Sequence, residues 1–323
     1  MTPVELSRTV LHAVRRAVAD GELEVAVPER VVVTEPGPGG CGDFATNVAL
    51  QLARPAGQPP GRVAEILRSR LVGAAGVRDV VVTGPGFLNI SLDALADPVT
   101  GLVEEILRQG AGYGHGDALA GQFLVLRVPY EVRAEVVADA VVRIVAAQGG
   151  RAVVEHGEPA DLRPVPAPED PAPLGPDAAR WALLHPAPHD RPRITADHLV
   201  QRESNPLFRV RYAHARVRSL SRNAARLGFG AVPGPVDARD LLTPLADHPR
   251  ILAAAATHRA PDRIARHLVT VADAALPFLP FVLPRGEEKP SAAHRARLAL
   301  AEAAGTVLAG GLSLLGIDAP EYL

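Results

Sequence analysis

The stretch from Asn205 to Leu227 constrains the fold most, because its apolar residues return every three or four positions. This spacing places them on one face of a helix, and that face must be buried against other parts of the chain. Asn205 and Pro206 are typical of a helix start, and Gly228 is typical of a helix end. The expected buried residues are Val210, Ala213, Val217, Leu220, Ala224 and Leu227.

The opposite face of this expected helix carries four arginines, which we call the arginine ladder. They are Arg211, Arg218, Arg222 and Arg226. Tyr212 and Arg216 lie along the border of the apolar stripe, and Glu203 is the only acid nearby in the sequence, so local ion pairing cannot explain the ladder. A stripe of one charge sign beside an aromatic ring fits phosphate contact and base stacking. The alternative is an ordinary solvated helix face.

The charge distribution also favours a nucleic-acid partner. The formal net charge is -2, yet residues 202–323 contain 16 Lys and Arg against 11 Asp and Glu. The single cysteine, Cys41, excludes an intramolecular disulfide and a cysteine-based zinc cluster and suits a reducing cytosol. We therefore expect a cytoplasmic protein with no metal site and no cofactor. We also expect no membrane span, because no stretch reaches about 18 consecutive apolar residues.

Periodicity and turn residues divide the chain into three expected parts: 1–120, 121–176 and 177–323. In the first part we expect an α+β or α/β domain with the order α-β-α-α-β-β-α. Its expected elements are a first helix, one or two strands in 23–33, a loop in 37–43, a helix over 44–52 capped by Asp43, a helix over 63–71, strands over 77–82 and 87–92, and a helix over 97–109.

The second and third parts differ in character. Residues 123–155 predict a β-α-β unit with strands over 123–128 and 152–155 around a helix over 134–147, and a linker rich in proline and acids follows. In the third part we expect a bundle with further helices in 251–256, 264–276 and 292–315. Its expected turns are marked by Pro233, Pro244, Pro261 and Pro284.

Several motifs resemble those of the arginyl-tRNA synthetases. The letters NPLFRVRYAHAR at 205–216 resemble the signature that opens the anticodon-binding helical domain of that family. The letters GDFATNVAL at 42–50 and GPGFLN at 84–89 resemble motifs of its N-terminal additional domain. The segments LGPDAARWALL at 174–184, PDRIARHL at 261–268, VLAGGLSLLGI at 307–317 and DAPEYL at 318–323 resemble further family segments.

This resemblance implies an α+β chain with a small N-terminal α/β domain, a truncated Rossmann-like β-α-β stub and a C-terminal all-α bundle of the DALR anticodon-binding type. It also implies tRNA as the partner. In the first domain, Phe87 would stack on a base of the D-loop and Asn89 would hydrogen-bond to it. The alternative is that Phe87 belongs to the core and Asn89 satisfies a turn.

In the helical domain the resemblance points to the anticodon arm. Tyr212 and Arg216 are the best candidates for the anticodon loop, and three ladder arginines, Arg211, Arg218 and Arg222, are expected on the arm. His214 is expected to pack or to hydrogen-bond within the protein. Tyr322 could stack on a base. Tyr322 and Leu323 stand where the family has Arg and Met, so arginine-specific selection of the anticodon is in doubt.

The expected nucleotide-binding loop departs from the family pattern. After the first strand of the β-α-β unit the family has a loop whose histidines bind the ATP phosphates, but the letters here are VPYEVRAE at 128–135. The Lys-Met-Ser-Lys-Ser loop is also absent, and Lys289 is the only lysine. We therefore expect a tRNA-binding paralogue without catalytic residues that is not an enzyme.

Three alternatives remain open from the sequence. Arg127, Glu131, Arg133 and His156 could improvise a site, although solvated charge near the strand ends is the expected role. The chain could instead be a regulatory module that binds a protein partner and no RNA. It could also retain an ATP-dependent adenylating activity.

Overall fold

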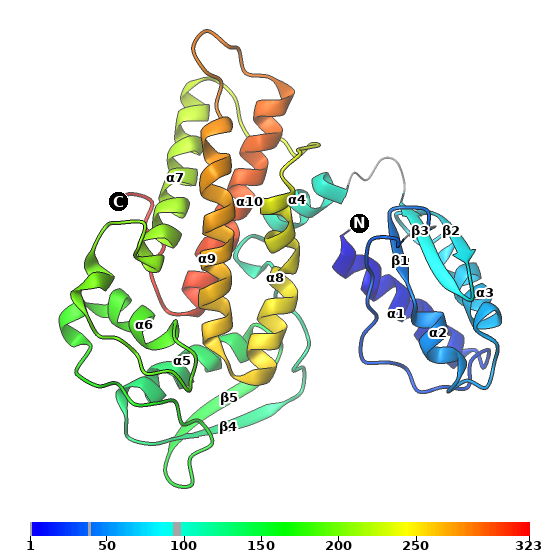
Figure 1. The fold of residues 1–323 in the computed structure, drawn as a ribbon, viewed down its shortest axis with the longest axis horizontal. Helices are drawn as coiled ribbons and strands as arrows, with labels where there is room; N and C mark the ends of the chain where they lie inside the picture. The colour runs from blue at the N-terminus through cyan, green and yellow to red at the C-terminus, as the bar shows by residue number, and fades with distance from the viewer. Residues whose placement is uncertain (1, 38–39, 93–97) are drawn as a thin grey trace. The chain divides into compact units, whose positions relative to one another are not determined.

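The structure, a computed structural model, describes residues 2–37, 40–92 and 98–323 and divides the chain into two compact units, 1–102 and 103–323 (Figure 1). The chain passes from the first unit into the second along α4 (Pro98–Gln109). The mixture of helix and sheet confirms the predicted α+β class. The boundaries predicted at 120 and 176 stay predictions.

The first unit is a three-stranded antiparallel sheet with three helices. The strands β1 (Phe44–Thr46), β2 (Val77–Thr83) and β3 (Phe87–Leu92) lie in the order β1-β3-β2. The helices are α1 (Pro3–Ala19), α2 (Val48–Ala53) and α3 (Pro60–Leu71). The start of α1 is fixed by a capping box, in which Thr2 and Glu5 satisfy each other's backbone N–H groups. The core of the unit is formed by side chains such as Leu6, Leu67 and Ile90.

The order α-β-α-α-β-β-α is present, although two of its elements differ from the prediction. The β-branched run 23–33 forms no strand, and the first strand is β1, within the predicted helix 44–52. Asp43 does not cap a helix, because its carboxylate accepts the N–H of Leu92 at 2.8 Å. The predicted helix start at Asp97 lies outside the described residues.

The second unit begins with a parallel pair of strands, as predicted. β4 (Phe123–Val128) and β5 (Arg151–His156) pair in parallel and are joined by α5 (Val132–Ala146). α5 also packs against α6 (Pro176–Leu184) and against the helices that follow it. The β-α-β unit therefore belongs to the same compact unit as the helices.

Four long helices lie side by side in the second unit (Figure 1). They are α7 (Pro206–Arg226), α8 (Arg239–His258), α9 (Pro261–Phe278) and α10 (Ala292–Leu314). The predicted turn at Pro244 is wrong, because α8 runs through both Pro244 and Pro249. Pro249 cannot donate to the carbonyl of Leu245, and the hydroxyl of Tyr113 donates to that carbonyl instead, at 3.1 Å. This replacement donor allows the helix to continue.

One described segment, Pro261–Phe281, is long and apolar enough to cross a membrane by length and composition alone. The segment is not a run of consecutive apolar residues, because it contains Asp262, Arg263, Arg266 and Asp273, so the prediction of no such run stands. This segment contains α9, which packs against α7, α8 and α10. A helix at the centre of a bundle passes the same test, so its hydrophobicity is explained by its place in the core.

Candidate nucleic-acid interface

The helix that carries the arginine ladder forms as predicted. The side chain of Asn205 accepts the N–H groups of Leu207 and Phe208 at the start of α7, and Gly228 adopts a φ of 77° just after its end. The predicted apolar face is buried from Val210 to Ala224, whereas Leu227 is exposed. α7 therefore holds its arginines on a well-fixed helix.

The first ladder arginine is held by groups far away in the sequence. The guanidinium of Arg211 forms an ion pair with Asp177 on α6, and its Nε donates to the carbonyl oxygen of Asp318 at 3.1 Å. The carboxylate of Asp177 also accepts the N–H of Asp318, at 3.4 Å. Arg211 thus joins α7 to α6 and to the end of the chain.

The next two ladder arginines contact the last residues of the chain. Both Nε and Nη2 of Arg218 donate to Oε1 of Glu321, at 3.0 and 2.7 Å. Nη1 of Arg222 lies 3.8 Å from Oε2 of Glu321, and the Arg222 guanidinium lies 4.2 Å from the ring centre of Tyr322. One carboxylate therefore faces two guanidinium groups, and the ring of Tyr322 stays 69% exposed.

The remaining candidates on α7 lie open to solvent. Tyr212, Arg216 and Arg226 are exposed, and neither arginine has an ion-pair partner among the described residues. The Tyr212 ring stacks on that of Phe208, with ring centres 5.5 Å apart. This part of the surface presents free positive charge next to an exposed aromatic ring.

His214 has the structural role expected for it. It is buried, and its Nδ1 lies 3.0 Å from the carbonyl oxygen of Pro320, so it also fixes the end of the chain. Burial lowers the pKa of His214, and the backbone hydrogen bond of Pro320 partly opposes this shift. Its imidazole is therefore kept mainly neutral near neutral pH.

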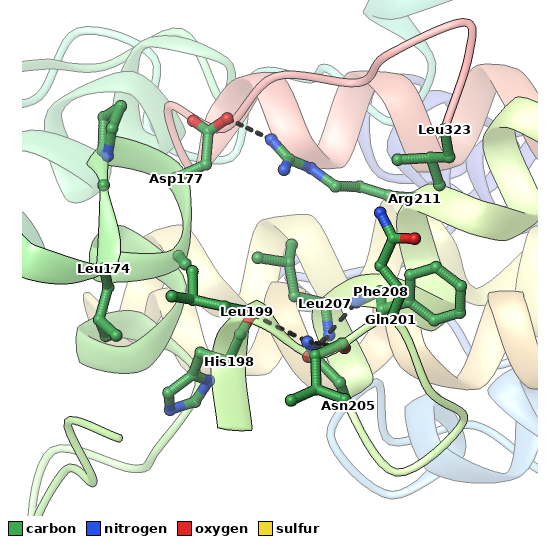
Figure 2. Close-up of a pocket in the computed structure, with 14 residues that line it drawn as sticks. Leu174, Asp177, His198, Leu199, Gln201, Asn205, Leu207, Phe208, Arg211 and Leu323 are labelled. Atoms are coloured by element: carbon green, nitrogen blue, oxygen red, sulfur yellow. Dashed lines mark hydrogen bonds and ion pairs between the residues drawn. The ribbon is translucent and has the colours of Figure 1, made fainter. Parts of the chain in front are cut away.

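A pocket of about 280 Å³ lies beside Arg211 (Figure 2). Figure 2 shows the Arg211 side chain reaching toward the carboxylate of Asp177, with Phe208 and Gln201 close to its base. The pocket walls also include Leu199 and the last residue, Leu323. Polar and apolar groups share the pocket walls about equally, with the Arg211–Asp177 ion pair at one edge, and this combination suits the flat ring and the polar rim of an unstacked nucleobase.

The two candidates in the first unit differ in accessibility. Phe87 is 40% exposed at the start of β3. Asn89 is 2% exposed, and its amide hydrogen-bonds to protein groups: Oδ1 accepts the N–H of Cys41 at 3.2 Å, and Nδ2 donates to the hydroxyl of Thr83 at 2.6 Å. Phe87 can reach a ligand directly, whereas Asn89 holds the loop that contains Cys41 against the sheet.

The charged residues near β4 do not all form solvated charge. Arg133 on α5 is fully buried, contrary to the expectation for residues at this place. Its guanidinium donates to five backbone carbonyls, those of Val165, Leu183, Pro186, Ala187 and Asp190, at 2.7 to 3.1 Å. Burial lowers the pKa of Arg133. Its role is structural, since every donor is used within the protein.

His156 and Glu135 remain near the ends of the two parallel strands. Nε2 of His156 lies 3.2 Å from Oε1 of Glu135, and the imidazole stacks on the exposed ring of Tyr130 at 4.6 Å. Glu131 caps α5 by accepting the N–H of Ala134 at 2.9 Å. These groups form a small polar cluster in which each side chain contacts another protein group.

Comparison with known proteins decides the family. Residues 5–92 match the family "Arginyl tRNA synthetase N terminal domain", and residues 210–323 match the family "DALR anticodon binding domain". The chain combines the N-terminal and DALR domains of the arginyl-tRNA synthetases. These two domains coincide with the first unit and with the helices α7 to α10. The resemblance drawn from the motifs at 42–50, 84–89 and 205–216 is confirmed.

Two similar curated proteins are arginine–tRNA ligases. That of Frankia alni is 26% identical over 556 aligned positions, which include the whole of both chains. That of Renibacterium salmoninarum is 43% identical over 48% of this chain and 30% of the relative. The first alignment is longer than the 323 residues of this chain, so some of its positions face no residue here.

The prediction that this arginyl-tRNA synthetase-like chain is not an enzyme is contradicted. A relative aligned over the whole of both chains is a ligase, and this points to an enzyme of the family. The prediction relied on the absence of two short ATP-binding motifs, one expected at residues 128–135 and the other before residue 174, and such absences do not establish that the chemistry is lost. The predicted loss of most of a catalytic domain is not confirmed.

Solved structures support the fold. An arginyl-tRNA synthetase of Thermus thermophilus is similar with a TM-score of 0.63 at 15% identity, and that of Plasmodium falciparum with a TM-score of 0.55 at 8% identity. Both similarities cover the whole of each chain. At these identities the likeness concerns the fold alone.

Proposed function

We propose that this arginyl-tRNA synthetase-like protein binds tRNA, with the arginine-rich face of α7 on the anticodon arm and Phe87 on the D-loop. The observation that carries this proposal is the arginine-rich face of α7, which places exposed Tyr212 beside Arg216 and the ladder. Guanidinium groups match phosphate oxygens, and an exposed ring can stack on a splayed base. Both kinds of contact come from one rigid helix.

The surface on α7 combines the two features that recognition of an RNA loop needs. Free guanidinium groups of Arg216 and Arg226 can contact the backbone, while the pocket beside Arg211 offers space for one base. Tyr322 adds a second exposed ring near the ladder. Tyr322 and Leu323 replace the family's usual ending, so sequencing of the retained RNA is the measurement that identifies the anticodon.

The first experiment should measure binding and activity together. The purified protein is titrated with total tRNA from its host in a filter assay, and the retained RNA is sequenced. In parallel, attachment of labelled arginine to the same tRNA in the presence of ATP tests the ligase reaction of the relatives. Retention of tRNA above other RNA of equal length supports the proposed function, and equal retention of all RNA contradicts it.

Replacing Arg211, Arg218 and Arg222 together by Ala is expected to weaken binding of every tRNA by at least about tenfold. Each lost phosphate contact should also reduce the slope of log affinity against log salt by roughly 0.7 to 0.9. A salt titration in the filter assay measures both effects. An unchanged affinity and slope would refute the role of the arginine ladder.

Two controls separate this effect from a loss of net charge or of folding. Replacing Arg250, Arg263 and Arg285 by Ala removes the same charge from exposed positions outside α7 and should change tRNA affinity little. Replacing only Arg218 and Arg222 by Ala keeps the ion pair between Arg211 and Asp177. This variant therefore tests the ladder without removing the contact that joins α7 to α6.

Phe87→Ala is expected to lower tRNA affinity by about 5- to 160-fold, because stacking of a base on an aromatic ring contributes roughly 1 to 3 kcal/mol. Val81→Ala, at another exposed position of the same sheet, should have little effect. A tRNA with a shortened D-loop provides the test of mechanism, since it should bind wild type and Phe87→Ala equally. If Phe87→Ala lowered the affinity for the shortened tRNA by the same factor, Phe87 would contact a part of the tRNA other than the D-loop.

A protein partner remains the alternative use of the same surfaces. Recovery of a salt-insensitive protein complex without tRNA from the host would favour it. The cytoplasmic location also stays a prediction. It can be tested by fractionating host cells and measuring tRNA-binding activity in each fraction.

A further inference from the structure

The last six residues of the chain lie on the arginine ladder and occupy much of it. This C-terminal segment, Asp318–Leu323, is fixed to the second unit by several separate contacts. The carbonyl of Asp318 accepts a hydrogen bond from Arg211, and that of Pro320 lies within hydrogen-bond distance of His214. The carboxylate of Glu321 forms ion pairs with Arg218 and Arg222. The segment is therefore seated on α7 through both its backbone and its side chains.

Glu321 makes the contact that an RNA phosphate would make. Its Oε1 accepts two hydrogen bonds from Arg218, at 3.0 and 2.7 Å, and its Oε2 lies 3.8 Å from Nη1 of Arg222. A phosphate group has the same need for paired guanidinium donors. Glu321 and an RNA phosphate therefore cannot both use these donors at once.

The contacts of the segment are of a kind that can be displaced. The side chains of Arg218, Arg222 and Glu321 are all about one-third to one-half exposed. Ion pairs with this exposure are weak, because water and salt screen them. The last residue, Leu323, forms part of the wall of the pocket beside Arg211, so movement of the segment would also widen that pocket.

We propose that the C-terminal segment is an internal competitor of RNA on α7, with Glu321 standing in the place of a phosphate. This proposal rests on the proposed function, since it concerns the same surface. RNA binding requires release of Glu321 from Arg218 and Arg222. The bound segment lowers the affinity of α7 for all RNA. An RNA binds only if its contacts with α7 replace every contact that the segment loses.

Glu321→Gln is the most direct test, because it keeps the size of the side chain and removes its charge. We expect tRNA affinity to rise about three- to tenfold and the salt dependence to steepen by roughly one phosphate contact. Glu203→Gln is the matched control: it removes the same charge from an exposed residue just before α7 that has no ion-pair partner among the described residues. It should change affinity by less than twofold.

The outcomes distinguish this inference from the proposed function. Wild type that binds tRNA, with Glu321→Gln no tighter than Glu203→Gln, overturns the competitor and leaves the proposed function intact. No tRNA binding by any of the three proteins overturns the proposed function and the competitor with it. Binding by Glu321→Gln alone supports both.

A second measurement follows the segment directly. Carboxypeptidase removes Leu323 and Tyr322 from the 323-residue protein at a rate that depends on how often the segment leaves α7. Addition of saturating tRNA should accelerate this removal if RNA displaces the segment. Slower removal with tRNA would show that RNA binds over the seated segment, and this would overturn the competitor.

Discussion

Arg133→Ala should lower the free energy of unfolding of the second unit by about 5 kcal/mol, because five backbone carbonyls lose their donor and an unsatisfied buried group costs about 1 kcal/mol or more. The whole stability of a domain is about 5 to 15 kcal/mol, so this loss is a large fraction of it. The five carbonyls that Arg133 satisfies come from Val165, from Leu183 near the end of α6 and from the loop 186–190. In the variant they become buried acceptors without donors.

Urea unfolding followed by the fluorescence of Trp181, the only tryptophan, measures this effect on the second unit. Arg151→Ala, at an exposed position of β5, is the control and should change the midpoint little. If Arg133→Ala does not fold, Arg133→Lys serves instead, because its ammonium cannot reach five carbonyls and should recover only part of the stability. Equal midpoints for the variants at 133 and 151 would contradict the structural role of Arg133.

The second unit should lose roughly 2 kcal/mol per buried histidine when the pH falls from 7 to 5. Three imidazoles carry this effect. Burial lowers the pKa of His248 to about 3, and that of His267 and His185 to about 4, from 6.5 in each case. Each unit of pKa corresponds to about 1.4 kcal/mol. Because the unfolded chain takes up these protons near 6.5 and the folded protein does not, stability is full above 6.5 and falls toward pH 4 and below.

The geometry explains why protonation is costly at two of these sites. The rings of Tyr113, His248 and His267 form a continuous stack, with ring centres 5.8 and 5.3 Å apart. Nδ1 of His248 and Nε2 of His267 are buried and have no hydrogen-bond partner among the residues that the structure describes. Neighbouring His115 also disfavours a charge on His248, while Asp247 and Arg250 act on His267 in opposite directions. A proton would therefore place an unsatisfied charge inside the bundle.

His248→Phe tests this explanation, because a phenyl ring keeps the stack and cannot be protonated. The difference in unfolding free energy between pH 7 and pH 5 should shrink by about 2 kcal/mol. His258→Gln, at an exposed position of the same helix, should leave the difference unchanged. Urea midpoints measured at intervals of half a pH unit provide the curve. A variant curve that matches wild type would mean that other groups drive the acid unfolding.

Local signals were sufficient to predict α7. The Asn205 cap, the glycine at 228 and the apolar spacing all act within one helix, and the structure confirms each of them except for Leu227. The parallel β4 and β5 were predicted for the same reason. Short-range rules failed where a group distant in the sequence decides the outcome. β1 exists because Phe44 pairs with Ile90. α8 continues past Pro249 because the hydroxyl of Tyr113 donates to the carbonyl of Leu245, which Pro249 leaves without a donor.

The candidate interface shows the same limit. The sequence predicted that no nearby acid pairs with the ladder, and this is correct within α7. The acids that do pair with it, Asp177 and Glu321, lie 34 and 103 positions from the arginines they contact. No periodic pattern connects such positions, so the occupied state of the ladder could not be predicted. Likewise, the burial of Arg133 depends on a loop whose path the sequence does not specify.

Arg133 holds residue 165, the end of α6 and the loop 186–190 through main-chain oxygens alone, and this has a consequence for mutational tolerance. The side chains at Val165 and Asp190 can change without removing a single acceptor. In a saturation library scored for folded protein, position 133 should accept almost nothing while those two positions accept most residues. Positions 165 and 190 could then vary in amino acid, while the guanidinium of Arg133 continues to hold their backbone in place.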